Sequence, residues 1–277
     1  MMNLNLKDKV VVITGAGGII CGGIAEALSD TGAKLALLDI NQEAVEKEAE
    51  KVRAMGCEAK GYRADVLDKT SLEQVREQLL ADFGPCDILI NGAGGNNPRA
   101  TTDNEYSADA AEGMKDFFAL DPDGVRFVFD LNFIGTFLPT QVFAQDMAGR
   151  KGCTILNVSS MNAFRPLTKI PAYSGAKAAV SNFTEWLAVH FAKDGIRVNA
   201  IAPGFFVTNQ NRDLLFNADG TPTPRTGKIL AATPMGRFGE VEEIMGAVRL
   251  LLSEEDAGFI TGVVIPIDGG FNAYSGV

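Results

Sequence analysis

The chain has 277 residues, of which 46% are hydrophobic, and its formal net charge at neutral pH is −10. Apolar segments and turn-forming segments alternate along the whole length, so we expect one large α/β domain over residues 1–277 with a sizeable core. Nucleic acids and anionic membranes are bound mainly through clusters of Lys and Arg, and the excess of acidic residues therefore argues against both as partners.

The sequence shows no targeting pattern and no metal-binding pattern. Residues 1–9 hold no apolar core of signal-peptide length, and no stretch reaches the ~18 uninterrupted apolar residues of a membrane span. The four cysteines have neither CxxC nor Cys/His ligand spacing, and His190 is the only histidine. We therefore expect a cytoplasmic protein without a metal site or a disulfide framework.

The first functional pattern is a glycine-rich turn between a strand and a helix. Residues 10–14 are apolar, residues 15–23 read Gly-Ala-Gly-Gly-Ile-Ile-Cys-Gly-Gly, and a helix is expected to run to about Asp30. Glycines let a pyrophosphate approach the backbone, and the free N–H groups at the start of the helix favour its negative charge. The pattern indicates a dinucleotide site, although a structural turn before a buried helix has the same sequence features.

An acidic residue at the end of the next strand favours NAD over NADP as the cofactor. The strand expected at 35–38 ends at Asp39, 24 residues after Gly15, and an acid that binds the adenosine ribose is expected after about 20. Its carboxylate would accept a hydrogen bond from the 2′-hydroxyl and would repel a 2′-phosphate. Asp39 could instead cap the helix expected over 42–55, but Asn41 is better placed to do so.

The following elements predict a doubly wound parallel sheet. A strand at 61–64, a helix at about 71–83 and a strand at 87–90 continue the alternation, which gives a parallel sheet with helices on both faces. Ligands collect at the carboxyl ends of such strands. The small residues of the segment 91–95, Asn-Gly-Ala-Gly-Gly, would let a cofactor lie against the backbone there.

The second half of the chain raises the expected number of strands to seven. Residues 96–120 are polar and irregular, which is typical of a surface elaboration, and 124–147 read as a long helix that Pro139 could kink. The remaining strands are expected at 154–158, 197–201 and 263–267, with a polar stretch over 209–228 and a helix over 241–252.

The main catalytic signal is the pair Tyr173 and Lys177. Residues four apart lie on one face of a helix, so the Lys177 cation could favour the phenolate of Tyr173, whose pKa is ordinarily about 10. A tyrosine placed in this way can act as an acid or a base near neutral pH. Taken alone, the two could be a surface pair. Asn132, inside the long helix, needs a partner for its amide, and a buried hydrogen bond would supply one.

Together these residues resemble the short-chain dehydrogenase/reductase family over about residues 9–270. The residues that match in order and spacing are Thr14-Gly15, Asp39, Asp65-Val66, Asn91 to Gly94, Asn132, Ser160, Tyr173 with Lys177, Pro203-Gly204 with Thr208, and Asp268-Gly269-Gly270. The resemblance implies a single Rossmann-type domain with a catalytic tetrad of Asn132, Ser160, Tyr173 and Lys177. It implies cofactor contacts from Gly15, Gly18, Ile20, Asp39, Ile40, Asp65, Val66, Asn91, Ala93, Gly94, Tyr173, Lys177, Pro203, Phe206 and Thr208.

Two segments depart from the family pattern. The family usually has glycine at the positions of Ile19 and Cys21, and asparagine at the position of Gly92. Side chains at 19 and 21 would crowd the pyrophosphate unless the neighbouring glycines reshape the turn. We therefore expect a dinucleotide site with altered phosphate contacts.

Within the family, residues 91–105, 160–169 and 203–212 resemble the bacterial branch of D-mannonate oxidoreductases, also called fructuronate reductases. The resemblance implies a sugar-acid substrate, and polar and cationic residues at the pocket mouth would suit one. These residues are Asn96, Asn97, Arg99, Arg165, Lys169, Gln210 and Arg212. We expect Ser160, Arg165 and Gln210 to contact substrate, with Arg165 as the carboxylate anchor and a substrate loop over about 205–235, although each cation could equally be a solvated surface charge.

The family resemblance implies hydride transfer between a nicotinamide and a secondary alcohol or ketone. Two alternatives remain open: a gluconate-type or polyol dehydrogenase of the same family, and a non-catalytic dinucleotide sensor. The helices at 124–147 and 173–192 carry more large apolar residues than one sheet-facing stripe needs, and in the family these helices pair into dimers and tetramers. These residues include Phe133, Phe137, Phe183, Trp186 and Leu187. We therefore expect a homo-oligomer.

Overall fold

Seven parallel strands form a single twisted sheet at the centre of the protein. The computed structural model describes residues 4–109, 112–207 and 212–276. The strands are β1 (Val10–Thr14), β2 (Lys34–Asp39), β3 (Glu58–Arg63), β4 (Ile88–Asn91), β5 (Thr154–Val158), β6 (Arg197–Pro203) and β7 (Val264–Ile267). Their order is β3-β2-β1-β4-β5-β6-β7, and every neighbouring pair is parallel. The predicted doubly wound, seven-stranded parallel sheet is confirmed.

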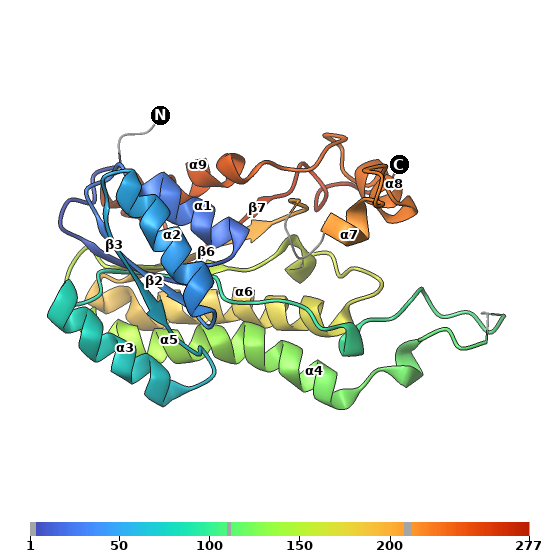
Figure 1. The fold of residues 1–277 in the computed structure, drawn as a ribbon, viewed down its shortest axis with the longest axis horizontal. Helices are drawn as coiled ribbons and strands as arrows, with labels where there is room; N and C mark the ends of the chain where they lie inside the picture. Colours follow the sequence, from blue (N-terminus) through green and yellow to red (C-terminus); the bar gives the residue numbers. More distant parts are fainter. Residues whose placement is uncertain (1–3, 110–111, 208–211, 277) are drawn as a thin grey trace.

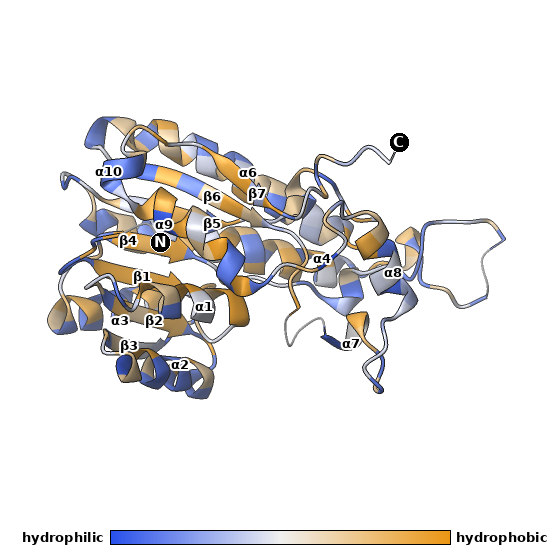
Figure 2. Cartoon of the chain, turned by 90° about the horizontal axis from the view of Figure 1, so that it is seen from above, coloured by the Kyte–Doolittle hydropathy of each residue, from blue (hydrophilic) through white to orange (hydrophobic). Residues whose placement is uncertain are grey.

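Helices cover both faces of the sheet (Figure 1). One face carries α1 (Ile19–Leu28), α2 (Gln42–Ala54) and α9 (Met245–Leu252), and the other carries α3 (Lys69–Asp82), α5 (Gly135–Phe143) and α6 (Pro171–Phe191). Each face has its own apolar core, since alternate residues of a strand point to opposite sides. Val11 of β1 packs in the first core and Val12 in the second. The central strands are accordingly almost uniformly apolar (Figure 2).

The topology determines where a ligand can bind. The strand order reverses between the neighbouring strands β1 and β4: β2 and β3 follow β1 toward one edge of the sheet, and β5, β6 and β7 follow β4 toward the other. Thr14, Asp39 and Asn91 end three neighbouring strands, so they meet at the same carboxyl edge. This reversal point is where open α/β sheets bind their ligands.

A long helical run places Asn132. It consists of α4 (Pro122–Phe129), a π-helical turn (Asp130–Ile134), α5 and a short 3₁₀ turn (Ala144–Asp146). The departure from α geometry therefore lies at Asp130–Ile134, before Pro139, where the kink was expected. The run is long and apolar enough to cross a membrane, but half of its most apolar window is buried in this fold, and it packs on α3 and α6 as a core helix.

Two regions differ from the sequence-based expectation. β3 begins at Glu58 rather than at Gly61, and the stretch expected to be only polar contains α7 (Arg212–Leu215) and α8 (Pro224–Ala231). The remaining helix, α10 (Glu254–Ala257), follows α9. The predicted surface elaboration leads into α4 and projects away from the body of the molecule (Figure 1).

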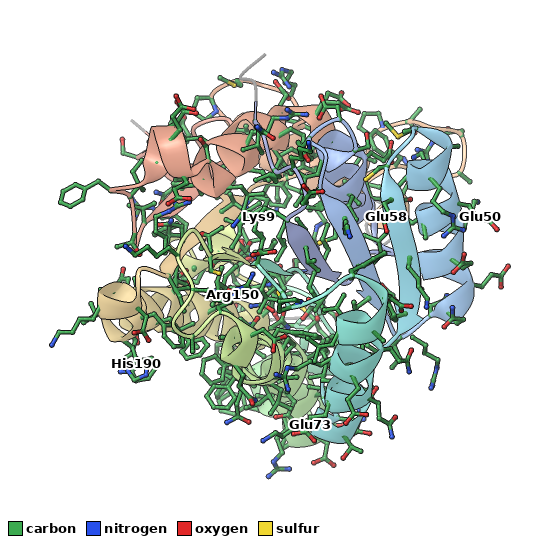
Figure 3. All side chains as sticks on the ribbon, turned by 90° about the vertical axis from the view of Figure 1, so that its left-hand side faces the viewer. Lys9, Glu50, Glu58, Glu73, Arg150 and His190 are labelled. Atoms are coloured by element: carbon green, nitrogen blue, oxygen red, sulfur yellow. The ribbon has the colours of Figure 1, made fainter. Side chains whose placement is uncertain are left out.

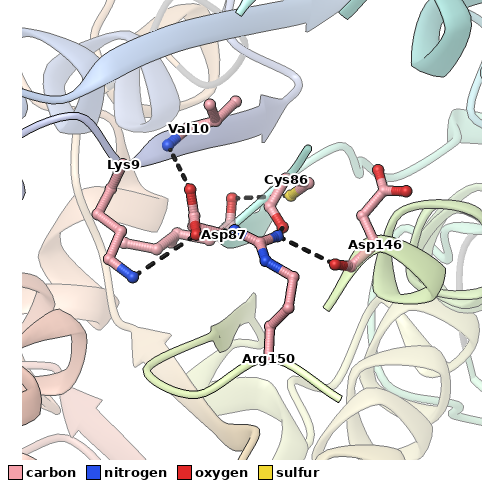
Figure 4. Close-up of polar contacts among 7 residues, drawn as sticks. Lys9, Val10, Cys86, Asp87, Asp146 and Arg150 are labelled. Carbon is pink, nitrogen blue, oxygen red and sulfur yellow. Dashed lines mark hydrogen bonds and ion pairs between the residues drawn. The ribbon is translucent and has the colours of Figure 1, made fainter. Parts of the chain in front are cut away.

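An ion-pair cluster around the buried Asp87 carboxylate joins the amino ends of β1 and β4. Figure 3 shows this side of the molecule, with Lys9 and Arg150 labelled. The Asp87 carboxylate accepts a hydrogen bond from the Val10 N–H at 2.9 Å and pairs with Arg150 and, at 3.5 Å, with Lys9 (Figure 4). Arg150 also donates to the Cys86 carbonyl at 2.9 Å. This cluster connects β1 and β4 to the loop before β5, which fixes the two central strands relative to each other.

Candidate active site

A cavity of about 750 Å³ lies along the carboxyl edge of the sheet. Its lining comes from the turn after β1, the ends of β2 and β4, the segment after β5, the first turns of α6 and the end of β6. Asp39 lines the cavity from the end of β2. Ser160 lines it from the segment after β5, and Tyr173 and Lys177 line it from α6. The cavity therefore joins the predicted cofactor residues to the predicted catalytic residues.

Asp39 is hydrogen-bonded to the backbone of the glycine-rich turn. Its Oδ2 accepts a hydrogen bond from the Gly17 N–H at 3.0 Å, and its Oδ1 accepts one from the Asn41 N–H at 2.9 Å. Asn41 is the residue that caps α2, since its side chain accepts from the Ala44 N–H at 3.1 Å. Asp39 is thus not needed as the helix cap, and its half-buried carboxylate lines the cavity.

The glycine-rich turn brings backbone close to backbone. Gly15 has a φ of +70°, and a Cβ added there would lie 2.8 Å from the Ala93 nitrogen. Gly18 is the N-cap of α1 and provides no side chain to bond the first N–H groups. The uncapped start of α1 lines the cavity through Ile19 and Ile20, so its positive end is directed to a site that would suit a phosphate.

The side chain of Cys21 is accommodated by the absence of a side chain at Gly92. A Cβ added to Gly92 would lie 2.0 Å from the Cys21 Sγ and 3.1 Å from the Thr14 carbonyl oxygen. Cys21 is buried, with 3% of its surface exposed. Two of the three departures from the family pattern, Cys21 and Gly92, are therefore one contact. The third, Ile19, is exposed and lines the cavity. Altered phosphate contacts stay a prediction.

Tyr173 and Ser160 come from adjacent elements. Tyr173 is the third residue of α6. Ser160 is the N-cap of the short 3₁₀ turn after β5 (Met161–Ala163). Burial raises the pKa of the Tyr173 phenol above its ordinary value, and a hydrogen bond with Ser160 acts in the opposite direction. The hydroxyl groups of the two residues are therefore coupled at the same cavity wall.

Lys177 lies one turn further along α6 and is 3% exposed. Its Nζ donates to the Val158 carbonyl at 2.8 Å and lies 5.8 Å from the centre of the Tyr173 ring. Desolvation by burial lowers the pKa of Lys177 to about 8. We expected Lys177 to lower the pKa of Tyr173; instead that pKa is raised, because burial of the phenol dominates.

Asn132 lies fully buried behind the cavity wall. Its Nδ2 donates to the carbonyls of Gly95 and Val128, both at 2.7 Å, and its Oδ1 accepts from the Gly95 N–H at 3.2 Å. The π-helical turn thus fastens the loop after β4. A Cβ added to Gly94 would lie 2.7 Å from this Oδ1 and 3.2 Å from the Lys177 Nζ, so Asn132 and Lys177 border the same small space.

The comparisons with known proteins agree on one protein family. A family model described as enoyl-(acyl carrier protein) reductase matches residues 15–272. An uncharacterized oxidoreductase of Haemophilus influenzae is 59% identical over 99% of this chain and 97% of its own length. The uncharacterized oxidoreductase UxuB of Bacillus subtilis is 50% identical over 99% of this chain and 98% of its own. The chain belongs to the short-chain dehydrogenase/reductase family. This membership confirms the expected class of enzyme, an oxidoreductase.

A solved structure agrees with this short-chain dehydrogenase/reductase fold over the whole chain. It is of a Haemophilus influenza protein described as a candidate D-mannonate oxidoreductase with bound NAD, and it covers 99% of both chains at 59% identity with a TM-score of 0.96. The single-sheet architecture of the present chain is therefore that of its relatives.

The structure brings together most of the residues expected at a short-chain dehydrogenase/reductase site. Those that line the cavity are Gly15, Gly18, Ile20, Asp39, Ile40, Asp65, Val66, Ala93, Gly94, Ser160, Tyr173, Lys177, Pro203 and Phe206. Asn91 does not line it; the side chain is buried, and its Nδ2 donates to Thr140 and Asn157, each at 2.9 Å. Thr208 and Gln210 lie outside the described residues.

The expected substrate cations do not line this cavity. Arg165 is exposed, and its Nε donates to the Asn272 carbonyl at 3.1 Å. Arg99 pairs with Asp121, and Arg212 is exposed at the start of α7. Lys169 is half-buried, and its backbone carbonyl accepts from the Thr102 N–H at 2.9 Å.

Sequence reasoning missed several residues of the site. Phe127 and Leu131 line the cavity from α4 and the π turn, and the Val158 carbonyl holds Lys177. The hydropathy of the long helix hid the two apolar residues among core positions. A backbone carbonyl has no side-chain signature, although Val158 directly precedes the Ser159-Ser160 pair at the end of β5.

Proposed function

We propose that the protein is an NAD-dependent dehydrogenase that interconverts a secondary alcohol and a ketone of a sugar acid, with D-mannonate and D-fructuronate as the first candidates. The observation that carries the proposal is that Asp39 and the group of Ser160, Tyr173 and Lys177 line one cavity. The relative with bound NAD, described as a candidate D-mannonate oxidoreductase, supports both the cofactor and the substrate.

The residues present fit a dinucleotide. The uncapped start of α1 and the glycines that precede it would receive the pyrophosphate, since a side chain at Gly15 or Gly17 would meet atoms within 2.9 Å. Asp39 would accept a hydrogen bond from the adenosine ribose and disfavour a 2′-phosphate. Bound NAD would supply the hydride acceptor of the oxidation.

The chain's own residues would manage the proton. Tyr173 would remove the hydroxyl proton of the substrate in the oxidation and return it in the reduction, and Ser160 would donate a hydrogen bond to the reacting oxygen. Lys177, with a pKa of about 8, could exchange protons near neutral pH. Asn132 would keep the loop after β4 in place through Gly95, and a water in the small space that it shares with Lys177 would extend the proton path.

Substrate oxidation tests this proposal. Purified protein would be assayed with D-mannonate, D-gluconate and a neutral polyol, each with NAD and with NADP, by following reduced nicotinamide. We expect the highest kcat/KM with D-mannonate and NAD. A higher value for gluconate or the polyol would favour the alternative dehydrogenases of the family. Binding of NAD without turnover of any substrate or of D-fructuronate would favour a dinucleotide sensor.

Arg165 does not line the cavity, but it is the proposed carboxylate anchor because its loop is held at both ends by Ser160 and Tyr173, which do. One charge-assisted hydrogen bond is worth about 1.5–3 kcal/mol. Arg165→Ala should therefore raise KM for a sugar acid about ten- to a hundredfold, with a smaller effect on a polyol. Arg126→Ala is a matched control, since Arg126 is an exposed arginine paired with Asp123. An unchanged KM in alanine variants at Arg165, Lys169, Arg99 and Arg212 would remove the physical basis for a sugar acid.

The proposal includes a cytoplasmic homo-oligomer, a dimer or a tetramer. A chain of ring contacts with centroid distances of 5.6–6.5 Å runs over the π-helical turn, α5 and α6, through Phe133, Phe137, Phe183 and Trp186. Trp186 is 56% exposed, whereas Leu187 is buried in the core beneath. A self-complementary helical face of this kind favours closed symmetry. Light scattering showing a monomer at micromolar concentration would contradict the assembly.

The proposed cytoplasmic location rests on the cysteines. The four buried free cysteines are compatible with a reducing compartment.

A further inference from the structure

Cys21 and Gly92 lie against each other in the lining of the proposed dinucleotide cavity, although they are far apart in the sequence. The position of a Cβ on Gly92 is 2.0 Å from the Cys21 Sγ but 3.6 Å from the Cys21 Cβ. The sulfur is therefore the closest obstacle to a side chain at 92, and the Thr14 carbonyl oxygen, at 3.1 Å, is the next. Both residues line the cavity.

The sulfur lies between two walls of the cavity that would both contact a bound dinucleotide. One wall is the first turn of α1, which contains Cys21. The other is the loop after β4, which is fastened to β1 because the N–H groups of Gly92 and Ala93 reach the Thr14 hydroxyl at 3.1 and 3.3 Å. A buried atom wedged between two such segments sets their spacing, because close-packed interiors do not compress.

We propose that the Cys21 sulfur and the missing side chain of Gly92 form a positioning pair that sets the spacing between the first turn of α1 and the loop after β4, and thereby the affinity for the dinucleotide. This inference rests on the proposed NAD-dependent function. Cys21 acts here by its volume, because burial raises the pKa of its thiol to about 12 and keeps it protonated.

The pair can be tested by removing one heavy atom from residue 21 and adding one at residue 92. Cys21→Ala removes the sulfur, Gly92→Ala adds a Cβ where the sulfur lies, and the double variant restores a single atom between the walls. The dissociation constant for NADH would be measured by fluorescence, and the melting temperature without cofactor would be measured for each protein.

We expect Gly92→Ala to raise the dissociation constant about tenfold or more, and Cys21→Ala to raise it about threefold. The double variant should bind NADH within about threefold of wild type, since the 2.0 Å clash is gone and the added Cβ then lies 3.1 Å from the Thr14 carbonyl oxygen and 3.6 Å from the Cβ of residue 21. Cys57→Ala, at a buried cysteine outside the cavity lining, and Gly246→Ala, at a glycine with no atom within 4 Å of an added Cβ, should leave the dissociation constant unchanged.

Additive losses in the double variant would overturn the pair, as would a change in melting temperature without a change in the dissociation constant. If Gly92→Ala does not fold, the comparison of Cys21→Ala with the double variant decides, because the pair requires the double variant to bind NADH more tightly. If the wild-type protein does not bind NADH, the proposed function fails together with this inference, whereas additive losses in a protein that binds NADH overturn the inference alone.

Discussion

The Asp39 carboxylate holds the Gly17 N–H at 3.0 Å and so joins the end of β2 to the glycine-rich turn after β1. One side chain therefore has two roles at the proposed cofactor site. It shapes the turn that would receive the pyrophosphate, and it presents its charge where the adenosine ribose would bind. These roles can be separated by substitution.

Asp39→Ala removes both the turn contact and the charge, whereas Asp39→Asn removes the charge and keeps one carbonyl oxygen as an acceptor. We expect both variants to lose preference for NAD over NADP, because the repulsion of a 2′-phosphate is gone. Asp39→Asn should bind NAD more tightly than Asp39→Ala, since the Gly17 contact can persist. The measurement is kcat/KM for each cofactor, and a wild-type protein that already prefers NADP would contradict the assignment.

Asn132 should affect cofactor binding through the backbone that it holds. Asn132→Ala leaves the N–H and the carbonyl of Gly95 without their partner, at a cost of about 1–3 kcal/mol in the free energy of unfolding. It should also raise the dissociation constant for NADH, because Gly95 lines the cavity.

Asn199→Ala is the control for Asn132, since Asn199 is equally buried and also bridges two backbone groups, those of Ile260 and Val263, away from the cavity. This variant should lose stability without losing NADH affinity. Equal affinity for NADH in both variants would show that Asn132 is only a packing residue.

Burial of Lys177 should make the stability of the protein depend on pH. Its pKa is about 8 in the folded protein and 10.5 is its ordinary value, so the unfolded chain binds more protons between these two pH values and this contribution to stability rises with pH across that window. Below pH 8 the folded protein carries the full cost of the buried charge.

Lys177→Met removes that dependence. Its stability advantage over wild type should shrink by about 3 kcal/mol as the pH rises through the window, because one pKa unit corresponds to about 1.4 kcal/mol. Urea unfolding at several pH values without cofactor measures the difference, and Lys193→Met, at an exposed lysine, is the control. A difference that does not change with pH would show that Lys177 keeps an ordinary pKa.

Asp87 should matter for stability and not for the cofactor. Asp87→Ala leaves the Val10 N–H, Arg150 and Lys9 without their shared carboxylate, which should lower the free energy of unfolding by about 3 kcal/mol. Glu73→Ala, which breaks an exposed pair with Lys69 on α3, should cost about 1 kcal/mol or less. Similar losses in the two variants, measured by urea unfolding, would contradict the importance of the buried cluster.

The fold could be predicted because its strands and helices follow local patterns. The apolar run at Val10–Thr14 and the alternation of elements after it are enough to predict a parallel sheet. β3 was placed too late because Glu58 and Lys60 alternate with buried residues at its start, so charge hides the strand. α8 was missed because its eight residues follow a polar stretch rich in Thr and Pro.

The site was predictable where chemistry lies in side chains at fixed spacing, as for Tyr173 and Lys177. It was not predictable where two distant segments share a volume. Nothing in the local sequence of Cys21 indicates that it fills the space above Gly92, and nothing in the local sequence of Lys177 indicates that its ammonium group bonds the Val158 carbonyl. These contacts depend on how β4 and β5 pack against α1 and α6.

The central claim is that Tyr173 is the acid and base of an NAD-dependent dehydrogenase, and turnover of Tyr173→Phe tests it most directly. The phenyl ring keeps the packing and loses only the hydroxyl, so the dissociation constant for NADH should stay within about threefold of wild type while kcat on the best substrate falls at least about a hundredfold. Tyr274→Phe, at a tyrosine that is 45% exposed, should match wild type in both measurements. Wild-type kcat in Tyr173→Phe would contradict the account.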